Sequence, residues 1–169
     1  YDLVEADPAV LRAMTDQADC IIDQVGEPPK VPITSLGWSP NHIESSTLLE
    51  PFMRLYNRTG EKRYLDFARY IVSTGGSEGY DIFRQAYDNV PPHEMGGPYP
   101  KAYEMMSCYD GLLELYKVTN DPRYLKAVEA TVTSIIADEI NIAGSGSSFE
   151  CFYKGKALQT EPAYHTMET

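Results

Sequence analysis

Apolar side chains near the start of the chain recur at steps of three and four residues, the spacing of one face of a helix. This stripe consists of Leu11, Met14, Ala18, Ile21, Ile22 and Val25. Asp7 followed by Pro8 supplies an N-cap and a proline at the first helical position, and Gly26 ends the stripe. We therefore predict a first helix over residues 8–25. Residues 27–40 contain four prolines and predict a long irregular connection.

An internal repeat is the strongest organisational signal. The segment Leu55–Leu65 recurs as Leu115–Leu125, with six identical residues at an offset of sixty (115 minus 55) and no gap. An apolar helical stripe precedes the motif in each copy, and a second stripe follows it. Gly60 and Asn120 stand between the stripes and predict left-handed helix ends. The repeat unit is therefore predicted to be a helical hairpin.

Proline and glycine mark further boundaries. Pro51 and Gly111 are also sixty positions apart, and we expect the first helix of each copy to kink or begin there. Residues 80–87 predict a short helix between the hairpins, and residues 90–100 predict a second irregular loop.

The helical patterns predict an all-α fold. A hairpin of sixty residues is too long for a tetratricopeptide unit and suits an α/α toroid, which closes with about six hairpins, or roughly 360 residues (six times sixty). The 169 residues of this chain are fewer than half of that number. We expect a single domain over 1–169 that forms an incomplete (α/α)6 toroid, with helical hairpins at about 41–75 and 101–140 and a functional loop at 144–169.

Composition narrows the function. A hydrophobic content of 43% is enough for one domain with a core. The net charge of -11 argues against nucleic acid and against anionic membrane surfaces, because both are bound through clustered Lys and Arg. Neutral ligands such as sugars fit this charge, and the thirteen tyrosines offer rings that stack and hydrogen-bond, although half-buried core positions explain them equally well.

The sequence is compatible with a periplasmic or a cytoplasmic location. Tyr1 has no leader before it, so either a signal was removed or the chain is a piece of a longer protein. The three cysteines, Cys20, Cys108 and Cys151, are widely spaced, which favours neither a disulfide framework nor a CxxC metal clamp.

The segment 144–169 has the residue types of a functional loop. It is glycine-rich, lacks a helical period, and holds three carboxylates, a histidine, a cysteine and several aromatic rings. Loops of this kind on rigid scaffolds carry much of protein chemistry. The alternative for a residue such as Glu150 is a solvated loop carboxylate.

Three stretches, 48–65, 102–125 and 144–169, together resemble the β-L-arabinofuranosidase-type glycoside hydrolase family of bacteria. The third is the most specific, with its glycine-rich loop, Glu150, an aromatic residue, Ala-Tyr and Glu-Thr in that order. The resemblance implies that Glu150 is the general acid/base and that Glu168 is a zinc ligand. It places a cysteine at the next position and two more downstream, one of them the zinc-bound nucleophile, so zinc is expected in the full-length protein and none on this fragment.

The chain also departs from the family pattern. Family members carry histidines near the starts of two helices, where this chain has Thr47 and Lys101. His42 is a candidate replacement, and so is His165, which lies in an apparent two-residue insertion between Tyr164 and Glu168. The alternative for each histidine is an ordinary surface or core position.

Further side chains are candidates for binding the substrate. Trp38 is suited to stack on a sugar face but equally to plug a packing gap, and Lys101 and Tyr164 complete the predicted substrate-binding set with His42 and His165. Cys151 directly follows Glu150 and would point away from it in an extended chain, so we do not expect it to be the nucleophile.

Three functions remain open on the sequence. The first is a retaining glycoside hydrolase acting on arabinosides or related sugars. The second is a non-catalytic α-helical module that binds glycans or proteins on a concave surface. The third, a sugar epimerase, would need histidine bases, of which the chain has only three. The expected partners are a carbohydrate and either the remainder of the toroid or a second copy.

Overall fold

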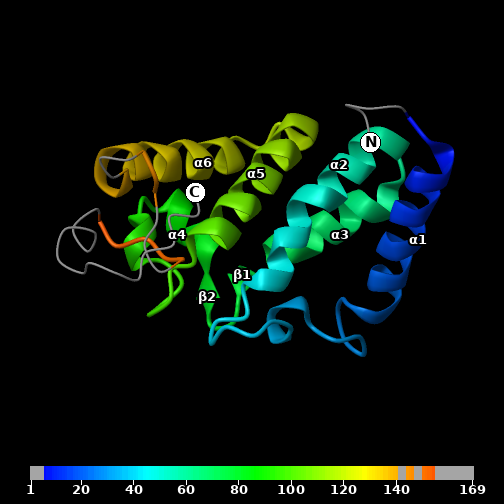
Figure 1. Cartoon of the computed structure of the whole chain (residues 1–169), viewed down its shortest axis with the longest axis horizontal. Coiled ribbons are helices and arrows are strands. Elements are labelled where there is room, and N and C mark those ends of the chain that lie inside the picture. Colours follow the sequence, from blue (N-terminus) through cyan, green and yellow to red (C-terminus); the bar gives the residue numbers. More distant parts are fainter. Residues whose placement is uncertain (1–5, 141–143, 147–149, 155–169) are drawn as a thin grey trace.

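A computed structural model describes residues 6–140, 144–146 and 150–154 of the chain. These residues are mostly helical, which confirms the all-α fold class (Figure 1). The described residues form six α-helices: α1 (Pro8–Gln24), α2 (Leu49–Thr59), α3 (Lys62–Ser73), α4 (Ile82–Tyr87), α5 (Ala102–Thr119) and α6 (Pro122–Ser134). Shorter turns are η1 (Ile33–Ser35), η2 (Glu44–Leu48), η3 (Pro92–Glu94) and the π-helical η4 (Ile135–Glu139).

The first helix begins where its cap predicts. The side chain of Asp7 accepts a hydrogen bond from the N–H of Ala9 (2.8 Å), and Pro8 occupies the first turn of α1. The irregular connection after α1 is fastened to α3 by Tyr70, whose hydroxyl donates to the carbonyl of Gly26 (3.0 Å) and accepts from the N–H of Ile33 (3.0 Å). Ile33 is fully buried, so this connection is part of the packed structure.

The two helical hairpins end their first helices in the same way. Gly60 and Asn120 both adopt a left-handed backbone, with φ of 72° and 54°, which confirms the predicted helix ends. The repeated threonines explain part of the motif: the hydroxyls of Thr59 and Thr119 each donate to the carbonyl four residues earlier (2.8 Å). The same hydroxyls accept the N–H two residues later, so one side chain closes each turn.

Pro51 and Gly111 do not mark equivalent helix starts. Pro51 lies in the first turn of α2, where proline is tolerated. Gly111 lies in the middle of α5, so the expected helix start is wrong there. Close packing accounts for this glycine, because a Cβ at position 111 would lie 2.6 Å from the backbone nitrogen of Glu50. The start of α2 therefore rests on the backbone of α5.

A small two-stranded antiparallel sheet, β1 (Gly76–Ser77) and β2 (Tyr80–Asp81), connects the first hairpin to α4. In Figure 1 the α2–α3 hairpin lies between α1 and the α5–α6 hairpin. One continuous core joins these elements, with fully buried side chains from both hairpins that include Leu49, Met53, Tyr64, Ile71, Leu112 and Leu115.

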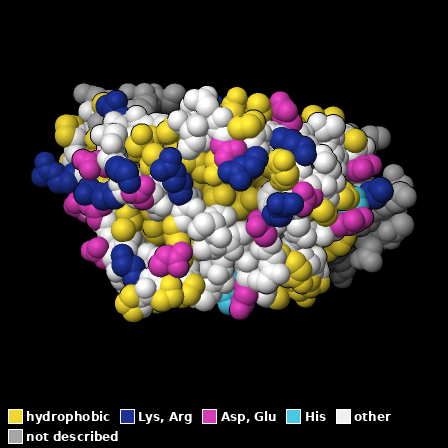
Figure 2. All heavy atoms as spheres, turned by 180° about the vertical axis from the view of Figure 1, so that it is seen from behind, with side chains coloured by type: hydrophobic (Ala, Val, Ile, Leu, Met, Phe, Trp, Pro, Cys, Tyr) yellow, Lys and Arg dark blue, Asp and Glu magenta, His cyan; other side chains and the backbone are white. Residues whose placement is uncertain are grey.

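Charged side chains of both signs are interspersed on the surface. On the face seen from behind, Lys and Arg stand next to Asp and Glu over much of the described surface (Figure 2). One such pair joins the two hairpins, from Arg54 on α2 to Asp110 on α5 (3.3 Å). Within the described part of the chain, no helix has the length and apolarity needed to cross a bilayer.

Replacing Gly111 tests the contact between the hairpins. We expect Gly111→Ala to lower the free energy of unfolding by about 1–3 kcal/mol, because the new Cβ overpacks against α2 backbone and outweighs the helical preference of alanine, about 1 kcal/mol. Glu129→Ala, at an exposed position on α6, is the control and should stay within about 0.5 kcal/mol. Urea denaturation measures both, and equal stabilities would contradict the close approach.

Candidate functional site

The segment 150–154 lies beside the start of α5. Cys151 pairs with Lys101 in an isolated antiparallel bridge, and the N–H of Phe152 donates to the carbonyl of Pro100 (3.0 Å). The N–H of Ala102, at the first position of α5, donates to the carbonyl of Glu150 (2.8 Å). Backbone contacts therefore cap the helix and hold Glu150 at its N-terminus.

Glu150 is paired with a buried lysine. Its carboxylate Oε2 accepts a hydrogen bond from the ammonium of Lys101, whose side chain is only 5% exposed. Burial is the largest influence and lowers the pKa of Lys101, but the hydrogen bond to Glu150 and the charge of Glu104 outweigh it, so the pKa is raised. Lys101 is therefore a cation at neutral pH. The Glu150 side chain is 40% exposed, which leaves its carboxylate accessible.

Glu104 is a second carboxylate at this lysine. It lies one turn along α5, with Oε1 3.8 Å from the Lys101 ammonium and Oε2 buried without a hydrogen-bond partner among the described residues. Burial raises the pKa of Glu104, and the nearby charges of Glu44 and Glu150 raise it further. Glu104 is not among the site residues predicted from the sequence, although its three-residue spacing from Lys101 on a predicted helix is a usable signal.

Trp38 completes the group that we call the Lys101 cluster: Trp38, Lys101, Glu104 and Glu150. The lysine ammonium lies 4.5 Å from the centroid of the Trp38 ring, and the tryptophan is 75% exposed. A cation over one ring fits the known preference of indole for ammonium groups. An exposed ring beside carboxylates offers both stacking and hydrogen bonding to a sugar.

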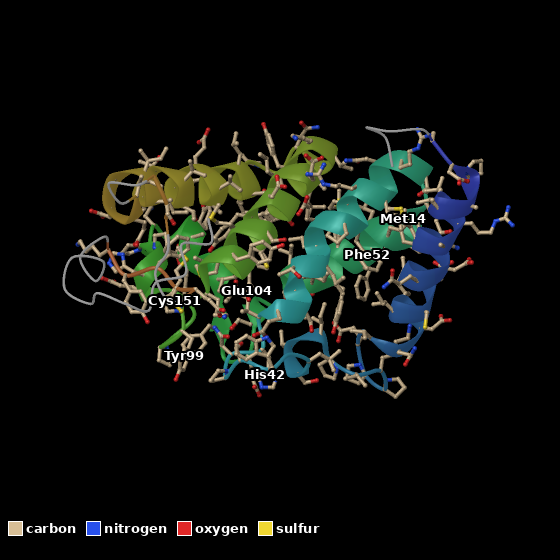
Figure 3. The ribbon with its side chains drawn as sticks, viewed as in Figure 1. Met14, His42, Phe52, Tyr99, Glu104 and Cys151 are labelled. Carbon is tan, nitrogen blue, oxygen red and sulfur yellow. The ribbon has the colours of Figure 1, made fainter. Side chains whose placement is uncertain are left out.

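His42 comes from the loop before η2 and adopts a left-handed backbone (φ 51°). Its Nε2 lies 3.5 Å from the carboxylate of Glu78, and its Nδ1 is buried without a hydrogen-bond partner among the described residues. His42, Tyr99, Glu104 and Cys151 come from separate segments and lie on one side of the molecule, well apart from Met14 (Figure 3). The His42 side chain is nonetheless paired with Glu78, outside the Lys101 cluster.

The cysteines give no exposed nucleophile at this site. Cys151 is buried, and burial raises its pKa, with Lys101 acting in the opposite direction. Burial also raises the pKa of Cys108 far above its usual range. All three cysteines carry free thiols, and Cys20 is the exposed one. The Cys151 environment disfavours the thiolate that a nucleophile needs.

Of the remaining positions singled out in the sequence, one is described by the structure and three are not. Thr47, where the family pattern has a histidine, donates its hydroxyl to the carbonyl of Glu44 (2.7 Å) and so caps a turn. Tyr164, His165 and Glu168 lie outside the described residues.

The described residues do not fit a metal site. Within 6–140, 144–146 and 150–154, no group of three or more His, Cys, Asp or Glu side chains is arranged to hold an ion.

Helical hairpins that present an accessible carboxylate, a buried cation and an exposed indole are a combination suited to a carbohydrate-active enzyme. The family model described as beta-L-arabinofuranosidase, GH127 catalytic domain, matches residues 1–169, so the chain belongs to this family of glycoside hydrolases and the resemblance is confirmed. No curated protein and no solved structure matches the chain.

The raised pKa of Glu104 predicts a pH-dependent stability. The folded protein holds a proton on Glu104 at pH values where the unfolded chain, near 4.5, has released it, so this residue makes stability fall as pH rises through that window. Glu104→Gln removes the effect and should gain in melting temperature relative to the native protein as the pH rises above 4.5. Glu129→Gln is the exposed control; parallel curves for native protein and Glu104→Gln would contradict the burial effect.

Proposed function

We propose that this chain carries the general acid/base half of a retaining β-L-arabinofuranosidase site, with Glu150 as the acid/base. One observation carries the proposal: the Glu150 carboxylate is accessible and is held on a buried cation beside an exposed ring. The substrate is a carbohydrate, as in other glycoside hydrolases, and family membership supports an arabinofuranoside. In a retaining mechanism the acid first protonates the leaving oxygen and later takes a proton from water.

Lys101 holds Glu150 in place. Its ammonium donates a hydrogen bond to Oε2 of Glu150, and the N–H of Ala102 donates to the Glu150 carbonyl. These contacts fix the carboxylate at the start of α5, beside the ring on which we propose that the sugar stacks.

The predicted substrate-binding residues divide by their surroundings. Trp38 and Lys101 belong to the Lys101 cluster, and we propose that the free face of Trp38 stacks on the sugar. His42, Tyr164 and His165 stay proposals that rest on the sequence. We also propose Glu168 as a zinc ligand on the family resemblance, with the nucleophilic cysteine beyond Thr169.

Substitution of Glu150 tests its role. In the natural full-length protein, Glu150→Gln should lower kcat on an aryl arabinofuranoside by about 10²–10⁴-fold, the usual contribution of a general acid/base. Sugar affinity should stay within about threefold, since the amide keeps the shape of the side chain. Titration calorimetry with the sugar measures that affinity.

Glu129→Gln is the matched control and should leave kcat unchanged. Undiminished turnover by Glu150→Gln would overturn the assignment. Sugar binding without turnover by the native protein, together with no zinc in the purified protein, would instead indicate the non-catalytic binding module.

We further propose that the two hairpins are consecutive units of an (α/α)6 toroid. The α5 helix covers a face of η2 and α2 on which Ser46, Leu49 and Met53 are fully buried. The residues sixty positions later, Met106, Tyr109 and Leu113, line an apolar groove with Val128, Val132 and Ile136 of the α6 side. Met106, Val132 and Ile136 are exposed. By analogy with α5 on the first hairpin, we propose that a third helical hairpin covers this groove.

Thiol labelling tests that occupant. In a Cys20→Ser background, with labelling followed by mass spectrometry of the peptide that carries the introduced cysteine, Met106→Cys in the natural full-length protein should react at least about tenfold more slowly than Glu129→Cys, because labelling would require local opening. In the 169-residue chain alone the two rates should be similar. Equal rates in both proteins would overturn the proposal, and protection that depends on protein concentration would indicate a second copy instead.

A further inference from the structure

A buried carboxylate outside the Lys101 cluster holds the segment that carries Glu150. Glu139 ends the π-helical turn η4, and its side chain is only 1% exposed. Its Oε2 accepts hydrogen bonds from the backbone N–H groups of Tyr153 (3.0 Å) and Lys154 (2.8 Å). Its Oε1 lies 2.7 Å from Nδ1 of His93 in η3. These three hydrogen bonds join the carboxylate to distant parts of the chain.

The contact with Glu139 determines which ring nitrogen of His93 carries the hydrogen. An ionised carboxylate only accepts hydrogen bonds, so Nδ1 of His93 must carry the hydrogen that lies between the two side chains. The other ring nitrogen, Nε2, is 3.6 Å from the carboxylate of Glu94, which is largely exposed. His93 and the two backbone N–H groups together satisfy both oxygens of Glu139, which offsets the cost of burying the charge.

Glu139 is too deeply buried to touch a substrate. Its effect must pass through the segment 150–154, which it holds at one end while Pro100 and Ala102 hold the other. Cys151 pairs with Lys101 in a β-bridge, and a slip of one residue in such a pairing turns each side chain to the opposite face. A loss of the Glu139 contacts would therefore move the Glu150 carboxylate relative to Lys101.

We propose that Glu139, oriented by His93, is a positioning residue for Glu150: the pair sets the register of residues 150–154 against the start of α5. The inference rests on the proposed role of Glu150 as the acid/base. A π-helical turn at the end of α6 fits such a role, since single π turns are frequent at functional sites.

The test uses leaving groups of different basicity on the natural full-length protein. A misplaced acid slows release of a poor leaving group, which needs a proton, much more than release of a good one. For Glu139→Ala we expect kcat to fall by on the order of 100-fold on the 4-methoxyphenyl arabinofuranoside and by less than about threefold on the 2,4-dinitrophenyl arabinofuranoside, with little change in KM.

Conservative variants separate positioning from simple destabilisation. Glu139→Gln keeps an oxygen for both backbone N–H groups, and a neutral His93 can accept from the amide through its other tautomer, so kcat should stay within about threefold of native. Asp138→Ala, on the exposed neighbour in the same turn, is the matched control. His93→Ala leaves the Oε2 contacts in place and carries the test if Glu139→Ala does not fold; its loss should again be larger for the poor leaving group.

Hydrogen exchange of the Tyr153 and Lys154 amides gives a readout that needs no activity. Both should exchange faster in Glu139→Ala than in Asp138→Ala. Faster exchange with equal losses on both substrates, or with none, would overturn the positioning role. If Glu150→Gln itself shows no leaving-group dependence, the proposed function fails, while the exchange data still report on the Glu139 contacts.

Discussion

A buried ammonium is the constraint on which the arrangement of the site depends. The Lys101 side chain is almost without solvent, and an unpaired charge in such a place would be strongly destabilising. Glu150 and Glu104 supply the compensating charge from two separate segments, and the Trp38 ring covers the cation from a third. One lysine thus brings together the start of a helix, the segment 150–154 and an irregular loop.

Glu104 and Glu150 both pair with Lys101, but their surroundings differ. Glu104 lies on the first turn of α5, and one of its oxygens is buried with no hydrogen-bond partner among the described residues. Burial raises its pKa. Glu150 is half-exposed and is held through its backbone carbonyl by Ala102. The site therefore combines an accessible carboxylate with an inaccessible one, which is an arrangement suited to divide roles between acid/base chemistry and charge balance.

The scaffold could be predicted to a large extent because its signals are local. The sixty-residue offset identified both hairpins, and Gly60 and Asn120 end their first helices as their backbone preferences predict. Gly111 could not be read in the same way. A glycine is needed there because the backbone of Glu50 on another helix approaches closely. Such a contact produces no periodic pattern in the sequence. A glycine that breaks a helix and one that admits a neighbour look alike in sequence.

The sequence by itself determined the all-α class, the helical hairpins with their caps, and the family, because apolar period, turn chemistry and ordered motifs are written in consecutive residues. It also singled out Glu150, Lys101 and Trp38 as separate candidates. Only the tertiary structure decided that these three form one cluster and that His42 turns to Glu78. Glu104 and the His93–Glu139 pair also emerged only there, since burial and pairing across 46 residues depend on the packed chain.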